Sequence, residues 1–140
     1  MIPDPAERLR ESGLRVTGPR VAVLSSLQAG SHLSTEEVLG AVRDRTGTAS
    51  LQGVYNVLAD LVAAGLVHRI EPAGHPALYE LARIENHHHL ICRSCGVVLD
   101  VICDHDREEC LVPPRLHGFT GIEAEIVFWG TCPECHRGTP

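Results

Sequence analysis

Two Cys-x-x-Cys pairs give the chain its clearest chemical signal. Cys92 and Cys95 form the first pair, and Cys132 and Cys135 form the second. Four thiolates presented by two tight turns bind Zn²⁺ tetrahedrally, and a site with four protein ligands leaves no open position for a substrate. We therefore expect a structural zinc ion that joins the C-terminal tail to the segment around Cys92, and on which the folding of this small half of the chain depends.

The six cysteines of the chain could instead form three disulfides or remain surface thiols. The N-terminal segment lacks the apolar stretch of an export signal, and no apolar run has the length of a membrane span. These features predict a cytoplasmic protein without a membrane partner, in a compartment where thiols stay reduced. The paired spacing then favours metal over disulfides.

A harder set of ligands surrounds the first cysteine pair. Side chains alternate along a strand, so His87 and His89 share one face and His88 points away. If the turn closes an antiparallel hairpin in which the two cysteines face each other, His87 faces Asp100. Two imidazoles and a carboxylate suit Fe²⁺, Mn²⁺ or Zn²⁺. A histidine run can also be a solvated cluster, but the adjoining cysteines favour metal.

The charge of the chain is acidic overall and basic at one end. A formal net charge of −6 argues against a protein that binds any polyanion. All 12 basic residues are arginines. Four arginines lie near the N-terminus: Arg8, Arg10, Arg15 and Arg20. A local basic patch of this kind suits contacts with phosphates.

The first half of the chain has the sequence signals of a small helical domain. Capping residues predict helices over 17–28, 34–45 and 50–64. The caps are Thr17, the capping box of Ser34 and Glu37, and Ser50, with Gly47 and Gly65 as stops. Strand-like runs at 66–70 and 77–81 follow, joined by a turn rich in proline and glycine. Three helices and a hairpin form a winged helix-turn-helix, although a generic α+β domain fits this half equally well.

The second half has the sequence pattern of strands. Segments 87–92, 97–102 and 122–129 alternate as strands do, and a linker at 84–86 precedes them. Between these strands, residues 104–115 are polar and contain Pro113 and Pro114, so any helix there is short.

Four motifs resemble those of the ferric uptake regulator family. They are residues 87–96, the Cys132–Cys135 pair, residues 14–20 and residues 54–58. The resemblance covers nearly the whole chain in the family's order. It is strongest to the actinobacterial branch of peroxide-responsive repressors of catalase genes. The motifs that resemble this branch are Cys103, Cys110, residues 117–119 and residues 123–125.

The resemblance implies an α+β homodimer that acts as a transcriptional repressor and not as an enzyme. Residues 1–83 would form a winged-helix DNA-binding domain, residues 84–86 a hinge, and residues 87–140 an α/β dimerisation and metal-binding domain with the zinc held by four cysteines. A regulatory Fe²⁺ or Mn²⁺ would bridge the two domains and set the spacing of the recognition helices. Its ligands, carried over from the family, would be His32, Glu80, His87, His89 and Asp100.

The chain departs from the family pattern at two places. In addition, two of the implied ligands bear on whether peroxide or iron is sensed. Residues 123–125 (Glu-Ala-Glu) stand where many members have a histidine of a further metal site, and Asn56 replaces an arginine common in iron regulators. Asp100 resembles the ligand of peroxide sensors, whereas Glu80 resembles that of iron sensors.

A peroxide sensor of this kind would lose its metal by oxidation of a ligand. Fe²⁺ with five ligands leaves a vacant position for H₂O₂, and the oxidant formed would attack His32 or His87, whereas a Mn²⁺ form would be insensitive. A rival route runs through Cys103 and Cys110. We favour bystander thiols there, because the acidic residues nearby would raise their pKa.

The third predicted helix has the side chains of a DNA reader. Gln52, Tyr55 and Asn56 lie early in this helix and away from its apolar stripe. Amides pair with adenine and a tyrosine ring packs on a thymine methyl, so we expect a double-stranded, A/T-rich palindromic operator. Arg15 and Arg20 should hold phosphates, with Arg8 and Arg10 adding to them. Tyr55 could alternatively be a half-buried core residue.

Other functions remain open at this point. An iron- or zinc-responsive regulator of metal uptake uses the same ligands. A mononuclear iron enzyme would leave the helices and wing without a purpose, and a zinc-storage module predicts no metal-dependent binding to DNA.

Overall fold

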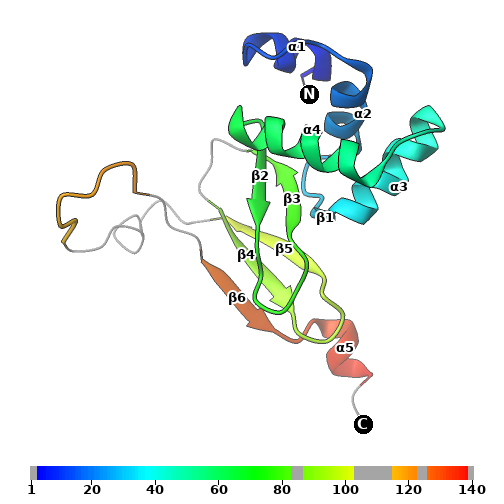
Figure 1. Ribbon diagram of the computed structural model, residues 1–140. Helices are drawn as coiled ribbons and strands as arrows, with labels where there is room; N and C mark the ends of the chain where they lie inside the picture. Colours follow the sequence, from blue (N-terminus) through cyan, green and yellow to red (C-terminus); the bar gives the residue numbers. More distant parts are fainter. Residues whose placement is uncertain (1–2, 83–86, 103–114, 123–125, 139–140) are drawn as a thin grey trace. The chain divides into compact units, whose positions relative to one another are not determined.

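The computed structural model describes residues 3–82, 87–102, 115–122 and 126–138. The chain divides into two compact units, residues 1–82 and 83–140, which are described separately below (Figure 1). The predicted linker at 84–86, Cys103, Cys110 and residues 123–125 lie outside the described residues. Within the described part of the chain, no helix has the length and apolar character needed to cross a membrane.

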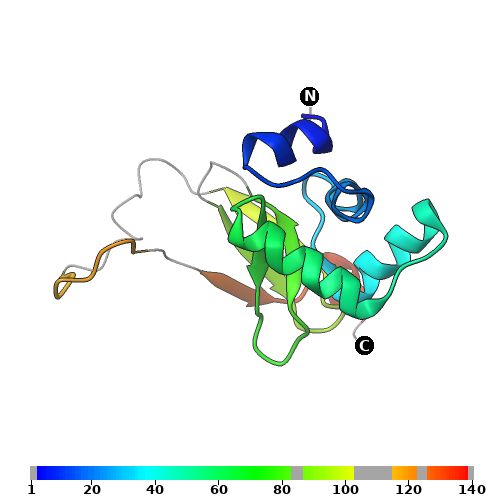
Figure 2. The same ribbon diagram turned by 45° about the horizontal axis from the view of Figure 1, so that its top comes forward.

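The described part of the first unit contains four helices, coloured from blue to green in Figure 2. They are α1 (Pro5–Glu11), α2 (Gly18–Ser26), α3 (Thr35–Thr46) and α4 (Leu51–Ala63). The predicted caps of α2, α3 and α4 are confirmed, including both hydrogen bonds of the capping box at Ser34. Gly47 ends α3 in the left-handed conformation, with a φ of 78° that a side chain would strain. Helix α2 ends two residues before the predicted end at Gln28.

Helix α1 and one short strand were not expected from the sequence. The Asp4 side chain accepts a hydrogen bond from the Glu7 backbone, and Pro5 begins α1 at a position where its missing N–H costs nothing. Strand β1 (Leu33–Ser34) joins β2 (Val67–Ile70) and β3 (Leu78–Leu81) in an antiparallel sheet of order β1-β3-β2. The strands β2 and β3 are the predicted hairpin, so the first unit is a winged helix.

One apolar core holds the helices of the first unit on one face of its sheet. Helix α4 contributes Val54, Leu58 and Leu61, all nearly inaccessible to water. The rest of the core comes from the other elements and includes Leu9, Val23, Leu24, Leu27, Val38, Val42, Val67, Tyr79 and Leu81. Because the apolar stripe of α4 packs into this core, the polar face of α4 is exposed to solvent.

The second unit is a three-stranded sheet with a short C-terminal helix. Its elements are β4 (His87–Cys92), β5 (Val98–Ile102), β6 (Val127–Gly130) and α5 (Pro133–Arg137). The strand order is β5-β4-β6, with β4 antiparallel to β5 and parallel to β6. The alternation predicted for β4 is confirmed, since the rings of His87 and His89 lie 5.0 Å apart while His88 packs on Phe128.

The predicted register of this hairpin is wrong by two residues. Asp100 pairs with His89, and His87 pairs with Ile102. The turn is longer than expected, because the Cys92 backbone N–H donates to the carbonyl of Val97 at 3.0 Å. Side chains on a strand alternate with a period of two, so a shift of two keeps Asp100 on the predicted face.

Candidate metal centres and DNA-binding surface

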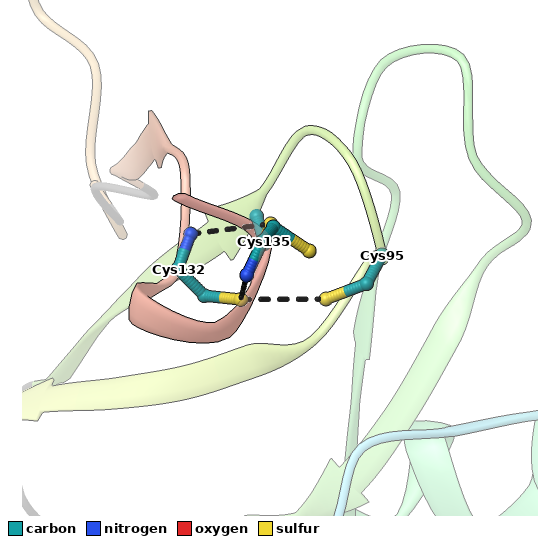
Figure 3. Close-up of side chains that lie close together, drawn as sticks. Cys95, Cys132 and Cys135 are labelled. Carbon is teal, nitrogen blue, oxygen red and sulfur yellow. Dashed lines mark hydrogen bonds between the residues drawn. The ribbon is translucent and has the colours of Figure 1, made fainter. Parts of the chain in front are cut away.

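The four cysteines of the two pairs converge in the second unit. All four Sγ atoms lie within 4.8 Å of one another, and those of Cys95 and Cys132 are 3.7 Å apart (Figure 3). Ligands about 2.3 Å from a tetrahedral Zn²⁺ are separated by about 3.8 Å, so the cluster fits this ion. A disulfide requires about 2.05 Å, and the four cysteines are free thiols.

The backbone on both sides supports sulfur in its charged form. Cys92 ends β4, and Cys132 is the N-cap of α5. The Cys132 N–H donates to the Cys92 sulfur at 3.3 Å, and the Cys135 N–H donates to the Cys132 sulfur at 3.5 Å (Figure 3). The parallel pairing of Cys92 with Gly130 brings the second cysteine pair beside the first.

The thiols hold their protons with unequal strength. Backbone N–H groups of Cys132 and Cys95 lower the pKa of Cys92 to about 5. The sulfurs of Cys132 and Cys95 raise the pKa of Cys135 to about 12. The Val97 N–H favours the Cys95 thiolate, but the sulfurs of Cys92 and Cys132 and burial outweigh it, so the pKa of Cys95 is also raised. Without a cation the four sulfurs therefore cannot all be ionised near neutral pH.

The first unit contains one part of the predicted regulatory ligand set. His32 Nε2 lies 2.9 Å from Glu80 Oε2, and both side chains are almost fully buried. His68, which the sequence analysis did not single out, approaches the other oxygen, with its Nδ1 3.1 Å from Glu80 Oε1. The strand register accounts for this contact, because His68 of β2 pairs directly with Glu80 of β3. A sequence analysis that fixed this register would have found His68.

The second unit contains the other part. The Nε2 atoms of His87 and His89 lie 4.0 Å and 3.7 Å from Asp100 Oδ1, and the His89 side chain is buried. Nitrogen and oxygen ligands about 2.1 Å from a divalent ion lie roughly 3.0–3.4 Å apart. Each histidine Nε2 is thus within about an ångström of the separation from Asp100 Oδ1 that a shared ion requires. As nitrogen and oxygen donors, the three side chains suit Fe²⁺, Mn²⁺ or Zn²⁺.

The opposite face of this sheet is apolar and exposed. Leu90, Leu99 and Phe128 lie on three neighbouring strands and are 39%, 55% and 48% exposed. His88 lies on the same face, and its buried Nδ1 has no hydrogen-bond partner among the described residues. A buried imidazole nitrogen without a partner is costly, and so is an exposed apolar strip.

The exposed face of α4 contains the predicted DNA-reading residues. Gln52 donates to the side-chain oxygen of Asn56 at 3.0 Å. Tyr55 is 46% exposed and lies outside the apolar core of the first unit, which argues against the alternative of a half-buried core aromatic. A hollow of about 340 Å³ lies between the start of α3, α4 and the β2–β3 hairpin, and Glu36, Tyr55 and Arg69 are among the residues that line it.

The two arginines predicted to hold phosphates differ in their surroundings. Arg15 is exposed. The Arg20 guanidinium instead donates to the Arg15 carbonyl at 2.9 Å and forms an ion pair with Asp60 of α4 at 3.0 Å. Arg20 therefore ties the segment before α2 to Asp60 of α4, a contact that spans 40 residues of the sequence.

Comparison with known proteins decides the family. The profile of the ferric uptake regulator family matches residues 11–125. The chain belongs to this family. Fur proteins are metal-responsive transcription regulators and not enzymes, so the mononuclear iron enzyme is set aside.

Relatives and solved structures agree with this assignment. The transcriptional regulator FurA of Mycobacterium tuberculosis is 51% identical, over 96% of this chain and 91% of the relative. The Fur structure of Vibrio cholerae is 29% identical with a TM-score of 0.74, over 92% of this chain and all of that one. The Pseudomonas aeruginosa Fur structure with manganese is 33% identical with a TM-score of 0.70, over 92% and 98%.

Zinc binding to the thiolate cluster should release protons. Cys95 and Cys135 have raised pKa values, so both carry a proton at neutral pH and must lose it to bind Zn²⁺. We expect at least two protons per zinc at about pH 7.5, and an affinity that falls as the pH falls because protons compete with the ion. Calorimetric titration of the zinc-free chain in buffers of different ionisation enthalpy measures this number. Release of less than one proton contradicts the assignment.

Arg20 should act on DNA through Asp60 more than through a phosphate. A partly exposed ion pair contributes up to about 1 kcal/mol, so Asp60→Asn and Arg20→Ala should each weaken operator binding by about twofold to fivefold. Neither should change the salt dependence, whereas Arg15→Ala should reduce the slope of log K against log salt by about one. Fluorescence anisotropy over a salt series tests this. A reduced slope for Arg20→Ala would instead assign Arg20 to a phosphate.

Proposed function

We propose that this chain is a metal-dependent transcriptional repressor of the cytoplasm that binds DNA as a homodimer and senses H₂O₂ through a regulatory Fe²⁺ or Mn²⁺. The observation that carries the proposal is the division of one hard ligand set between the two units. His32 and Glu80 stand together in the winged helix, and His87, His89 and Asp100 stand together in the second unit.

Each group of ligands is incomplete without the other. Two or three nitrogen and oxygen donors bind a divalent ion weakly, while five approach the coordination that Fe²⁺ and Mn²⁺ prefer. Strand β3 ends at Leu81 and β4 begins at His87, so the two groups are close along the chain. Bringing them together closes a short loop and costs little chain entropy.

A shared ion would select one arrangement of the two units. An ion that binds five ligands in one arrangement and fewer in others stabilises the first by the difference in affinity. In a dimer, that arrangement sets the spacing of two α4 helices, which must reach half-sites about 34 Å apart. The Vibrio cholerae Fur structure reveals a structural rearrangement of its DNA-binding domains, which supports a movable winged helix.

The thiolate cluster and the apolar strip would provide a stable dimer. The cluster has four soft ligands and fits a structural Zn²⁺, which leaves the regulatory role to the harder ligands. Association with a second copy would cover Leu90, Leu99 and Phe128, and would give His88 Nδ1 the opportunity to find a partner.

The reading residues favour an A/T-rich palindromic operator. Gln52 and Asn56 carry amides that match the hydrogen-bonding edge of adenine, and the exposed Tyr55 ring suits a thymine methyl. The hydrogen bond between the two amides fixes their relative position before DNA arrives. Two-fold symmetry of the dimer implies an inverted repeat.

The peroxide response would act by destroying a ligand. Fe²⁺ held by these ligands would activate H₂O₂ for cleavage of its O–O bond and would be regenerated in the net reaction, in which the imidazole supplies both electrons. In net terms, one oxygen atom replaces hydrogen on an imidazole carbon of His32 or His87, and the second leaves as water, so the imidazole is oxidised by two electrons. Oxidised imidazole binds metal poorly, the two units separate, and the repressed catalase genes are released.

A second function is favoured by the relatives themselves. The Mycolicibacterium fortuitum relative that is 45% identical is named a ferric uptake regulation protein. Glu80 also supports iron sensing, because this position resembles that of iron regulators. In this alternative, Fe²⁺ itself is the signal and metal-uptake genes are the targets; a zinc-responsive regulator would differ only in the ion that fills the site.

Operator binding should require the regulatory ion in addition to the structural zinc. We expect Mn²⁺ to increase affinity for a palindromic duplex by about tenfold or more, as an allosteric coupling of about 1.4 kcal/mol or more. His89→Ala and Asp100→Ala should lose this increase and keep one zinc per chain. Gel shifts with light scattering measure affinity and stoichiometry. Equal affinity without the regulatory ion, or one chain per duplex, would refute the proposal.

H₂O₂ should oxidise the Fe²⁺-loaded chain and leave the Mn²⁺-loaded chain unmodified. After treatment of the Fe²⁺-loaded chain with H₂O₂, intact-mass measurement should show one added oxygen atom, and peptide mapping should assign it to His32 or His87. The Mn²⁺-loaded chain is the control and should remain unmodified. If the Fe²⁺-loaded chain keeps both its mass and its affinity for DNA after peroxide treatment, the result favours the iron-responsive alternative.

A further inference from the structure

Three side chains form a row across the sheet of the first unit. His68 of β2 pairs directly with Glu80 of β3. On the other side of β3, Leu33 of β1 pairs with Tyr79, so the antiparallel register brings His32 beside Glu80. Glu80 therefore lies between two histidines, one on each neighbouring segment.

The two oxygens of Glu80 are used by different imidazoles. Oε2 lies 2.9 Å from His32 Nε2, and Oε1 lies 3.1 Å from His68 Nδ1. The Glu80 and His32 side chains are 4% and 3% exposed, whereas His68 is 46% exposed. A buried carboxylate requires hydrogen-bond or ionic partners, and here an imidazole lies within reach of each oxygen.

The burial of these groups indicates a division of roles. His32 and Oε2 form the inner pair that we assign to the regulatory ion. His68 reaches the oxygen on the other side of the carboxylate, so an ion held by Oε2 and His32 does not need His68 as a ligand. Groups that hydrogen-bond to a ligating carboxylate fix its orientation and so raise the affinity of the site.

We propose that His68 is a positioning residue of the regulatory metal site, which holds Glu80 by Oε1 and presents Oε2 to the ion. This inference rests on the proposed function, because it assumes that Glu80 is a ligand. It requires a hydrogen on Nδ1 of His68, since a carboxylate oxygen only accepts. The sheet register supplies the alignment.

The test compares two substitutions at this position. Asn carries an N–H donor on the same carbon that carries Nδ1 in histidine, so His68→Asn retains the bond, whereas His68→Ala removes it. His75→Ala is the matched control, because it removes a histidine from the turn of the same hairpin. The probe is Mn²⁺ binding to the zinc-loaded chain, measured by competition with a fluorescent chelator.

We expect His68→Ala to weaken Mn²⁺ binding by about 10-fold to 100-fold, the usual effect of losing a group that orients a metal ligand. His68→Asn should bind within about threefold of the parent chain, and His75→Ala should match the parent. Zinc content and the Tm without Mn²⁺ should be unchanged in all three variants. A merely structural role would instead lower the Tm of His68→Ala measured without Mn²⁺.

Two results would overturn the inference. One is a His68→Ala chain that binds Mn²⁺ as tightly as the parent or more tightly, and the other is a His68→Asn chain as weak as His68→Ala. Glu80→Ala separates this failure from that of the proposed function. If Glu80→Ala lowers Mn²⁺ affinity while His68→Ala does not, only the positioning role is lost. If Glu80→Ala has no effect, the ligand set itself is wrong.

Discussion

Four sulfur atoms within 4.8 Å of one another impose the strongest constraint on the second unit. Their charges repel, so the cluster requires a divalent cation to exist in its fully ionised form. The cluster also connects the end of β4 to α5, which follows β6. The sheet that presents His87, His89 and Asp100 is thereby fixed at the cysteine end of its central strand. Metal bound at the soft cysteine site would therefore stabilise the sheet on which His87, His89 and Asp100 are aligned.

The two kinds of metal chemistry are separated by donor type and by strand position. Sulfur ligands occupy one end of β4 and nitrogen ligands the other, with Leu90 and Ile91 between them. In the proposed function, this separation would limit the exchange of ions between the two sites, because Zn²⁺ prefers the thiolates while Fe²⁺ and Mn²⁺ accept imidazole and carboxylate. In the winged helix, the contacts of Glu80 are likewise divided between two roles. One buried carboxylate contacts an inner and an outer histidine, and only the inner one belongs to the predicted ligand set.

The sequence predicted those parts of the fold that depend on local interactions. Caps at Thr17, Ser34 and Ser50 act within one helical turn, and the strands of both sheets followed from alternation. The cysteine cluster was also predictable from short sequence patterns, because the two Cys-x-x-Cys pairs define its four ligands. The features that were missed depend on contacts between distant segments. Asp60 meets Arg20 across 40 residues, and His68 meets Glu80 through a hairpin register that spacing alone does not determine.

The turn between β4 and β5 shows how the second unit tolerates change. The register differs from the simplest hairpin by two residues, and yet Asp100 remains on the face of His87 and His89. What matters to this face is therefore the parity of the connection and not its length. A shift of the β4–β5 pairing by two residues slides the carboxylate along the same side of the sheet. A shift by one residue would turn it to the opposite face, beside Leu90, Leu99 and Phe128. The pairing of these strands can therefore change only in even steps without moving Asp100 away from His87 and His89.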